Sequence, residues 1–240
     1  MKRSYTPGIA GTRRGFTLVE LLTVIAIIAI LAAILIVGVG KVMQKGKQTQ
    51  ALNQLRTLGT AIDLYRTENK NFYPFSRKNG AVGDEYWSEV IKHHLSGWQS
   101  VRITTYAGTP NVRATPDLLC PLLDSDRHNH LGDFGVNGAL MVRENTSYAL
   151  NSQGPSRISG SVVARPAQTV LIMTAEATDR TPPYGNWYVA THQYVTNPNA
   201  AQRPADRGTG FVFSRFVDGH VEAVPLADMQ TKAARYLLPQ

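Results

Sequence analysis

An uninterrupted apolar run of 19 residues, at positions 21–39, constrains this 240-residue chain more than any other feature. Thr23 is its only polar side chain. As an α-helix rising about 1.5 Å per residue, the run is about 29 Å long, close to the hydrocarbon thickness of a bilayer. A cleaved secretory signal is the competing interpretation, but the run is too long and no small-residue cleavage site follows it. We therefore expect a retained transmembrane helix over residues 16–40.

Charge is distributed unevenly around this run. The formal net charge is +8, from 25 basic and 17 acidic residues. Residues 1–15 hold four of the bases and no acid, so without them the balance falls to +4. The surplus is therefore partly a targeting signal. No basic stripe interleaved with aromatics is present, and we expect no binding to nucleic acid. Three lysines on the other flank (Lys41, Lys45 and Lys47) leave the direction of insertion open on charge alone.

The residues before the run form a specific pattern. A short basic leader ends in Gly15, and then come Phe16, three further residues and Glu20, within RRGFTLVELLTVIAIIAILAAI. This N-terminus resembles that of the type IV pilin and type II secretion pseudopilin superfamily. The resemblance implies that a prepilin peptidase cuts between Gly15 and Phe16 and methylates the new amine of Phe16. It also implies a cytoplasmic N-terminus, an inner-membrane helix and an extracytoplasmic head.

Glu20 is an acid at the start of a membrane helix, where ionisation is unfavourable without a partner. The family gives the matching glutamate a role in assembly, in which the amine of an incoming subunit neutralises it. Two alternatives remain at this point: contact with headgroups or water, or a favourable interaction with the helix dipole. The partners implied by the resemblance are the peptidase, copies of this chain and other pilins, the inner-membrane assembly machinery and membrane lipid.

Past the run, apolar residues recur at spacings of three and four, at Leu52, Leu55, Leu58, Ile62 and Tyr65. This spacing predicts an amphipathic helix over residues 41–73 that continues the membrane helix and packs on a sheet of the same chain. A free coiled coil would need several more heptads. Pro74 disfavours helix at the residue before it and marks the end. The stretch AIDLYRTENKNFYP also resembles the helix end of major, G-like pseudopilins.

The rest of the chain, residues 74–240, has the mixed pattern of an α+β head. One helical face is expected in GDEYWSEVIKHHLSGW; it consists of Trp87, Val90, Ile91, either His94 or Leu95, and Trp98. Strand patterns occur at residues 101–106, 146–151, 169–175 and 211–217. The last leads through Asp218-Gly219 into 220–224, which predicts a hairpin with a two-residue type I′ turn. That turn would place Arg215 opposite Glu222 and Phe216 opposite Val221.

A second, weaker resemblance covers the C-terminal region. The segments CPLL, TSYALNSQG, ARPAQTVLIMTAEA and FVFSRFVDGHVEAV follow one another as in large prepilin-like proteins with an H-x9-DG element. The DG matches Asp218-Gly219, but Gly208 stands where the histidine would be.

Few residues are candidates for metal binding or catalysis. In DSDRHNHLGDFG, Asp124 and Asp126 are spaced like the first ligands of a calcium loop, with Asp133 near by, but the glycine and glutamate of an EF-hand are missing. Calcium is therefore one candidate, zinc a lesser one, and a solvated loop the plain alternative. No hydrolase elbow, HExxH or phosphate loop is present. We interpret the single cysteine, Cys120 between apolar residues, as a buried hydrophobe, and we expect no enzyme.

Together these features predict a pilin-like α+β fold: a leader (1–15), a membrane helix (16–40), an amphipathic helix (41–73) and a head with an antiparallel sheet (74–240). The predicted function is that of a structural subunit of a secretion pseudopilus, a surface pilus or a DNA-uptake fibre, and the G-like helix end favours secretion. The alternative is a single-pass anchor that carries an extracytoplasmic binding or enzymatic domain. That alternative explains the apolar run but gives no purpose to Glu20 and Gly15-Phe16.

Overall fold

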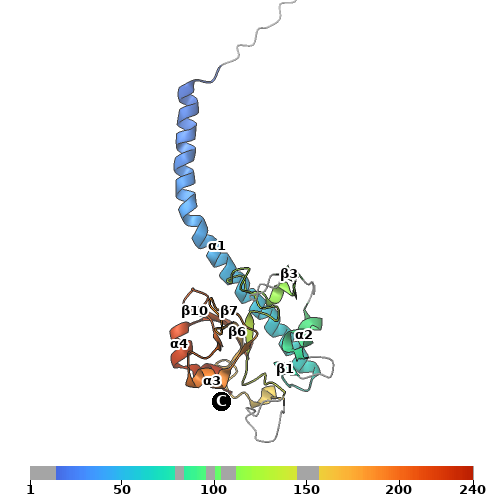
Figure 1. Cartoon of the computed structure of the whole chain (residues 1–240). Helices are drawn as coiled ribbons and strands as arrows, with labels where there is room; N and C mark the ends of the chain where they lie inside the picture. The colour runs from blue at the N-terminus through green and yellow to red at the C-terminus, as the bar shows by residue number, and fades with distance from the viewer. Residues whose placement is uncertain (1–14, 79–83, 96–100, 104–111, 145–156, 240) are drawn as a thin grey trace, which may run out of the picture. The chain divides into compact units, whose positions relative to one another are not determined.

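The computed structural model describes residues 15–78, 84–95, 101–103, 112–144 and 157–239 (Figure 1). The chain divides into two compact units, Met1–Lys45 and Gly46–Gln240. The first described helix, α1 (Leu18–Glu68), begins in the first unit and ends in the second. Its composition explains the helix, because alanine, leucine and other good helix formers dominate and no proline interrupts it.

In the second unit, α1 ends at Glu68, five residues before the expected boundary at Tyr73. Lys70 and Asn71 follow with φ of 54° and 65°. The Asn71 amide donates to the carbonyl of Arg66 at 2.8 Å, which closes a Schellman-type cap. The left-handed backbone of Lys70 and Asn71 therefore ends the helix, several residues before Pro74.

The head contains a seven-stranded sheet centred on β6 (Val170–Ala177). The strand order is β11-β10-β6-β5-β8, and β7 and β9 also pair with β6. All pairs are antiparallel except β5 with β8, so the sheet is mixed rather than purely antiparallel. The other strands of this sheet are β5 (Phe134–Asn137), β7 (Tyr184–Gly185), β8 (Tyr188–Val189), β9 (Gln202–Pro204), β10 (Phe211–Phe216) and β11 (Val221–Pro225).

Shorter elements complete the head. Two small antiparallel ribbons are formed by β1 (Arg77–Lys78) with β2 (Glu85–Tyr86) and by β3 (Val101–Ile103) with β4 (Val112–Ala114). The short helices are α2 (Trp87–Ile91), α3 (Thr191–Thr196), α4 (Leu226–Thr231) and α5 (Ala233–Leu237). Three 3₁₀ turns, η1 (Lys92–His94), η2 (Pro116–Leu118) and η3 (Gly160–Val162), connect them. These elements, with α1 and the mixed sheet, confirm the predicted α+β fold. The amphipathic part of α1 packs on the sheet through the larger hydrophobic core.

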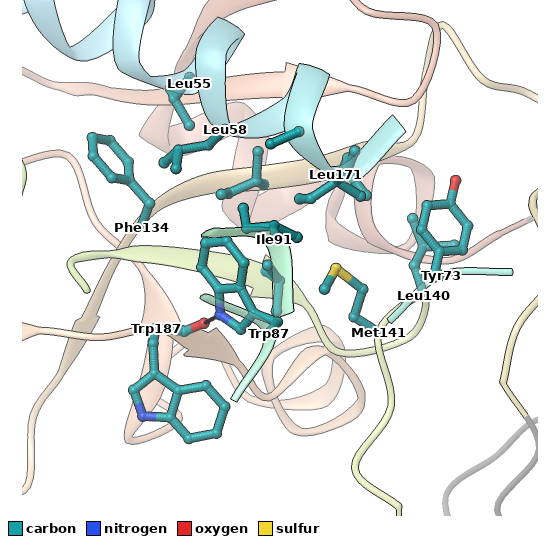
Figure 2. Packing of buried hydrophobic residues seen from close by; sticks show 14 of the residues in the cluster. Leu55, Leu58, Tyr73, Trp87, Ile91, Phe134, Leu140, Met141, Leu171 and Trp187 are labelled. Atoms are coloured by element: carbon teal, nitrogen blue, oxygen red, sulfur yellow. Dashed lines mark hydrogen bonds between the residues drawn. The ribbon is translucent and has the colours of Figure 1, made fainter. Parts of the chain in front are cut away.

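The predicted apolar stripe of α1 forms the centre of the larger core (Figure 2). Leu55, Leu58 and Ile62 are fully buried, and they share a cluster with Trp87 and Ile91 of α2 and with residues of the sheet. The Trp87 indole donates to the carbonyl of Trp187 at 2.9 Å. A second cluster joins the sheet to α3, α4 and α5. Neighbouring residues of β10, Val212 and Phe213, fall in different clusters, as side chains that alternate between two faces should.

The strand predictions at 169–175, 211–217 and 220–224 correspond to β6, β10 and β11. The prediction at 101–106 is confirmed for β3, and its last three residues lie outside the described part of the chain. The strand expected at 146–151 lies wholly outside it. The helical face was predicted correctly at Trp87 and Ile91 of α2, which are buried. Leu95 is also buried, but it follows η1 with extended backbone, and Trp98 is not described.

The predicted register of the last hairpin is wrong by one residue. β10 and β11 pair Ser214 with Glu222 and Arg215 with Val221. The Phe216 amide donates to His220 and the Gly219 amide donates to Phe216, so the loop has three residues, with φ of 104° at Gly219 alone. This is the type I turn with a glycine bulge that three-residue hairpin loops use. Arg215 contacts Asp63 of α1, and Phe216 stacks on His220 at 4.2 Å between ring centroids.

Gly219→Val is expected to destabilise the head by about 1–3 kcal/mol, because a β-branched residue is strained at positive φ. Gly219→Asn should cost less, since asparagine tolerates such angles better. Thermal unfolding of the full chain in detergent measures both variants. Equal melting temperatures for wild type and Gly219→Val would show that the loop adopts another conformation.

Candidate processing and assembly site

The described chain begins at Gly15, three residues before Leu18, the first residue of α1. Phe16 is 81% exposed, and a Cβ atom added at Gly15 would have no heavy atom within 4 Å apart from its chain neighbours. No contact within the described chain therefore requires glycine at this position. Any requirement for glycine there has to come from a partner that approaches the backbone.

Thr17 and Glu20 form a reciprocal cap at the start of α1. The backbone amide and the hydroxyl of Thr17 donate to Oε2 of Glu20 at 2.9 and 2.8 Å, and the Glu20 amide donates to the Thr17 hydroxyl at 3.2 Å. Thr17 is the N-cap and Glu20 the third helical residue, which is the arrangement of a capping box. Our sequence analysis missed it, although the spacing Thr-x-x-Glu before an apolar run is its signature.

The cap uses only one oxygen of the Glu20 carboxylate. Both bonds from Thr17 go to Oε2, and within the described residues no hydrogen bond or ion pair to Oε1 is found. Cleavage after Gly15 would leave the amide and the hydroxyl of Thr17 in place. The cap is therefore compatible with the mature chain, and Oε1 remains available to a positive group from outside.

The residues that follow present an apolar surface on every side. Fourteen large hydrophobic side chains between Phe16 and Val39 are more than 40% exposed, for example Leu22, Ile28 and Leu35. Within the described residues, α1 is the one helix long and apolar enough to cross a membrane; its most apolar 18 residues have a mean hydropathy of 3.2 and none is buried. Such a surface is stable in lipid or against other apolar helices.

The three aspartates considered for calcium have different surroundings in the structure. Asp124 and Asp126 are exposed, and Asp124 lies 3.7 Å from Arg127. Asp133 is fully buried: Oδ2 accepts from the Cys120 amide at 2.9 Å and lies 2.5 Å from His128 Nδ1, and Oδ1 accepts from the Asn129 amide at 2.9 Å. Asp133 therefore holds its own loop together. No group of three or more His, Cys, Asp or Glu side chains suited to a metal ion exists among the residues that the structure describes.

The residues considered for catalysis are buried or take part in contacts within the head. Cys120 is fully buried, and burial raises the pKa of its thiol to about 11, so the thiol is protonated at neutral pH. The His220 ring stacks on Phe216, and its Nδ1 lies 2.6 Å from Asp218. Gly208, at the position of the expected histidine, has φ of 72° and no neighbouring heavy atom within 4 Å of an added Cβ.

Comparison with known proteins adds one finding, at the N-terminus. Residues 11–36 match the family model of the prokaryotic N-terminal methylation motif. This motif is the signature of the type IV pilin and pseudopilin superfamily. No curated protein and no solved structure matches the chain.

The motif indicates a pilin-like protein that is processed by a prepilin peptidase and assembles with other pilins. With the apolar helix it indicates a membrane-anchored, single-pass protein whose role is structural.

Proposed function

We propose that this chain is a subunit of an extracytoplasmic filament, inserted as a precursor and assembled through α1 after removal of residues 1–15. The observation that carries the proposal is the order of Gly15, Phe16 and Glu20 at the start of α1, whose most apolar 18 residues are unburied, within the matched motif. The oxygen of Glu20 that the cap leaves free supports the role in assembly. In this proposal the head lies outside the cytoplasm, and the chain is not an enzyme.

The chemistry at the N-terminus favours pairing between subunits. Cleavage creates a positive amine on Phe16, and removal of the leader takes away the bases that precede it. Four positions further along lies the first acid of the mature chain, Glu20. In an apolar environment the amine of one subunit and the carboxylate of another neutralise each other, which reduces the cost of placing either charge at membrane depth. Such a pair also sets the axial offset between subunits.

Among filament types, we favour a type II secretion pseudopilus. The support is the resemblance of AIDLYRTENKNFYP to the helix end of major pseudopilins, and this stretch forms the last turns and the cap of α1. Deletion of the chain from its host is expected to block the export of secreted proteins while surface adhesion and DNA uptake continue. The opposite pattern would assign the subunit to a surface pilus or an uptake fibre.

Gly15→Val is expected to leave uncleaved precursor in the membrane. A Cβ at this position meets no atom of the described chain, so a failure of cleavage reflects the approach of the peptidase rather than misfolding. Mass spectrometry of the wild-type N-terminus, with an immunoblot of both proteins, tests this. We expect a methylated Phe16 in the wild type and a mass larger by 15 residues in the variant.

Two results would contradict the proposal. An intact Met1 in the wild-type protein would show that no processing occurs, and cleavage after residue 40 would identify a secretory signal. Either result would favour the alternative of an anchored or released binding domain. Gly46→Ala is the matched control, since it also adds one Cβ in open space and should be processed normally.

A further inference from the structure

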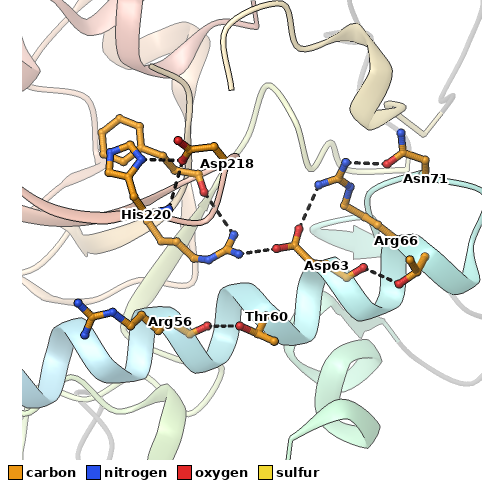
Figure 3. A network of polar contacts seen from close by, with 10 residues as sticks. Arg56, Thr60, Asp63, Arg66, Asn71, Asp218 and His220 are labelled. Atoms are coloured by element: carbon orange, nitrogen blue, oxygen red, sulfur yellow. Dashed lines mark hydrogen bonds and ion pairs between the residues drawn. The ribbon is translucent and has the colours of Figure 1, made fainter. Parts of the chain in front are cut away.

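Arg215 of β10 crosses α1 at a single glycine, Gly59. Its side chain is only 4% exposed, and an added Cβ at Gly59 would lie 1.8 Å from its Cδ and 2.0 Å from its Nε. Beyond this crossing, Nη2 of the guanidinium pairs with Asp63, one turn further along the helix. Figure 3 shows Asp63 on α1, with dashed lines to Arg66 and to a second guanidinium group. The other carboxylate oxygen of Asp63 accepts from Arg66 at 3.0 Å. The pair therefore ties one strand of the sheet to one turn of α1.

The apolar contact between α1 and the sheet does not by itself fix the axial position of α1 relative to the sheet. Leu52, Leu55 and Leu58 are three residues apart, and Leu55 and Ile62 are seven apart. A shift of the helix by about one turn, roughly 5.4 Å, places one of these apolar residues where another had been. Hydrophobic burial is non-directional, so it distinguishes such positions weakly.

The polar contact is specific where the apolar one is not. Gly59 is the only glycine in residues 47–68, and Asp63 is the only aspartate in α1. A shift by three residues in one direction would replace Gly59 with Ile62, whose side chain would meet Arg215, and would replace Asp63 with Arg66. The displaced helix would thus combine a steric clash with a repulsion between Arg66 and Arg215, whose own side chain is buried while that of Asp63 is 37% exposed.

We propose that Gly59, Asp63 and Arg215 act as a register pin that fixes the axial position of α1 on the sheet. Buried polar contacts are known to select one register among several apolar ones, at some cost in stability. The pin is a property of the head itself and stands whether or not the chain forms filaments. Within a filament it would hold all heads at one height along their helices.

The test is a distance measurement by pulsed electron paramagnetic resonance on the full chain in detergent. Spin labels are attached at Glu222 of β11 and, in separate samples, at Thr60 or Thr67, which are all exposed, with Cys120→Ala as the background. The wild-type pin should give one narrow distance distribution for each pair. In the double variant Asp63→Leu/Arg215→Met, we expect a second population, displaced by up to about 5.4 Å.

The matched control is Glu176→Leu/Arg203→Met, which removes an ion pair, 2.9 Å long, between β6 and β9. A second arginine, Arg207, lies 3.9 Å from Glu176, as Arg66 lies beside Asp63. It should keep the single wild-type distribution. A folded Asp63→Leu/Arg215→Met variant with unchanged, narrow distances would overturn the proposal. Loss of the fold in that variant and in Asp63→Leu alone would also overturn it, because the pair would then be needed for stability rather than for the choice of register.

Discussion

Glu20→Ala is expected to be cleaved and retained in the membrane, but to enter filaments poorly or not at all. Loss of a desolvated ion pair of about 2 kcal/mol or more lowers the equilibrium constant of each subunit addition by about thirtyfold. The measurement is the yield of filaments after shearing and sedimentation, beside an immunoblot of the processed subunit in membranes. Filament yield like that of wild type would refute the role of Glu20 in assembly.

Glu20 has two possible roles, charge pairing between subunits and capping of the helix, and variants of the capping box separate them. Glu20→Gln keeps an acceptor for the Thr17 amide but carries no charge, so it should fail almost as fully as Glu20→Ala. Thr17→Val removes the capping hydroxyl, at a cost of about 1 kcal/mol to the helix start, and leaves the carboxylate in place. Thr17→Val should therefore assemble better than either Glu20 variant. If Thr17→Val fails and Glu20→Gln succeeds, capping rather than charge pairing explains the acid.

The second large effect is expected at Gly59. In an exposed helix, Gly→Ala stabilises by about 0.8–1 kcal/mol through helix propensity. At Gly59 the new Cβ would occupy the path of the Arg215 side chain and force it away from Asp63. Overpacking costs about 1–3 kcal/mol, and a buried arginine without its partner adds to this. We expect a net loss of about 2 kcal/mol or more, which is about 4–8 °C in melting temperature for a domain of this size.

Gly46→Ala is the control for this prediction, because it lies in the same helix with nothing near an added Cβ. It should raise the melting temperature slightly, whereas Gly59→Ala should lower it. Thermal unfolding of the full chain in detergent, followed by circular dichroism, measures both. Equal upward shifts for the two variants would mean that Arg215 does not cross the helix at Gly59.

Local sequence determined the helix and the N-terminal motif. An apolar run of membrane length, the three- and four-residue spacing of Leu55, Leu58 and Ile62, and the order of Gly15, Phe16 and Glu20 are all short-range features, so they can be read from the chain alone. The capping box of Thr17 and Glu20 belongs to the same kind, because its two residues are three apart. Its signature, Thr-x-x-Glu before an apolar run, is as local as the charge pattern of the leader.

Contacts between residues far apart in the chain decided the rest. The hairpin register differs by one residue from the prediction because the loop has three residues rather than two, and Arg215 finds its partner Asp63 152 positions away. Likewise, the buried Asp133 accepts hydrogen bonds from the amides of Cys120 and Asn129, contacts that its spacing from Asp124 and Asp126 does not predict. A sequence pattern shows which groups have charge or polarity, but only tertiary packing determines which partner satisfies a buried charge, since that partner can come from anywhere in the chain.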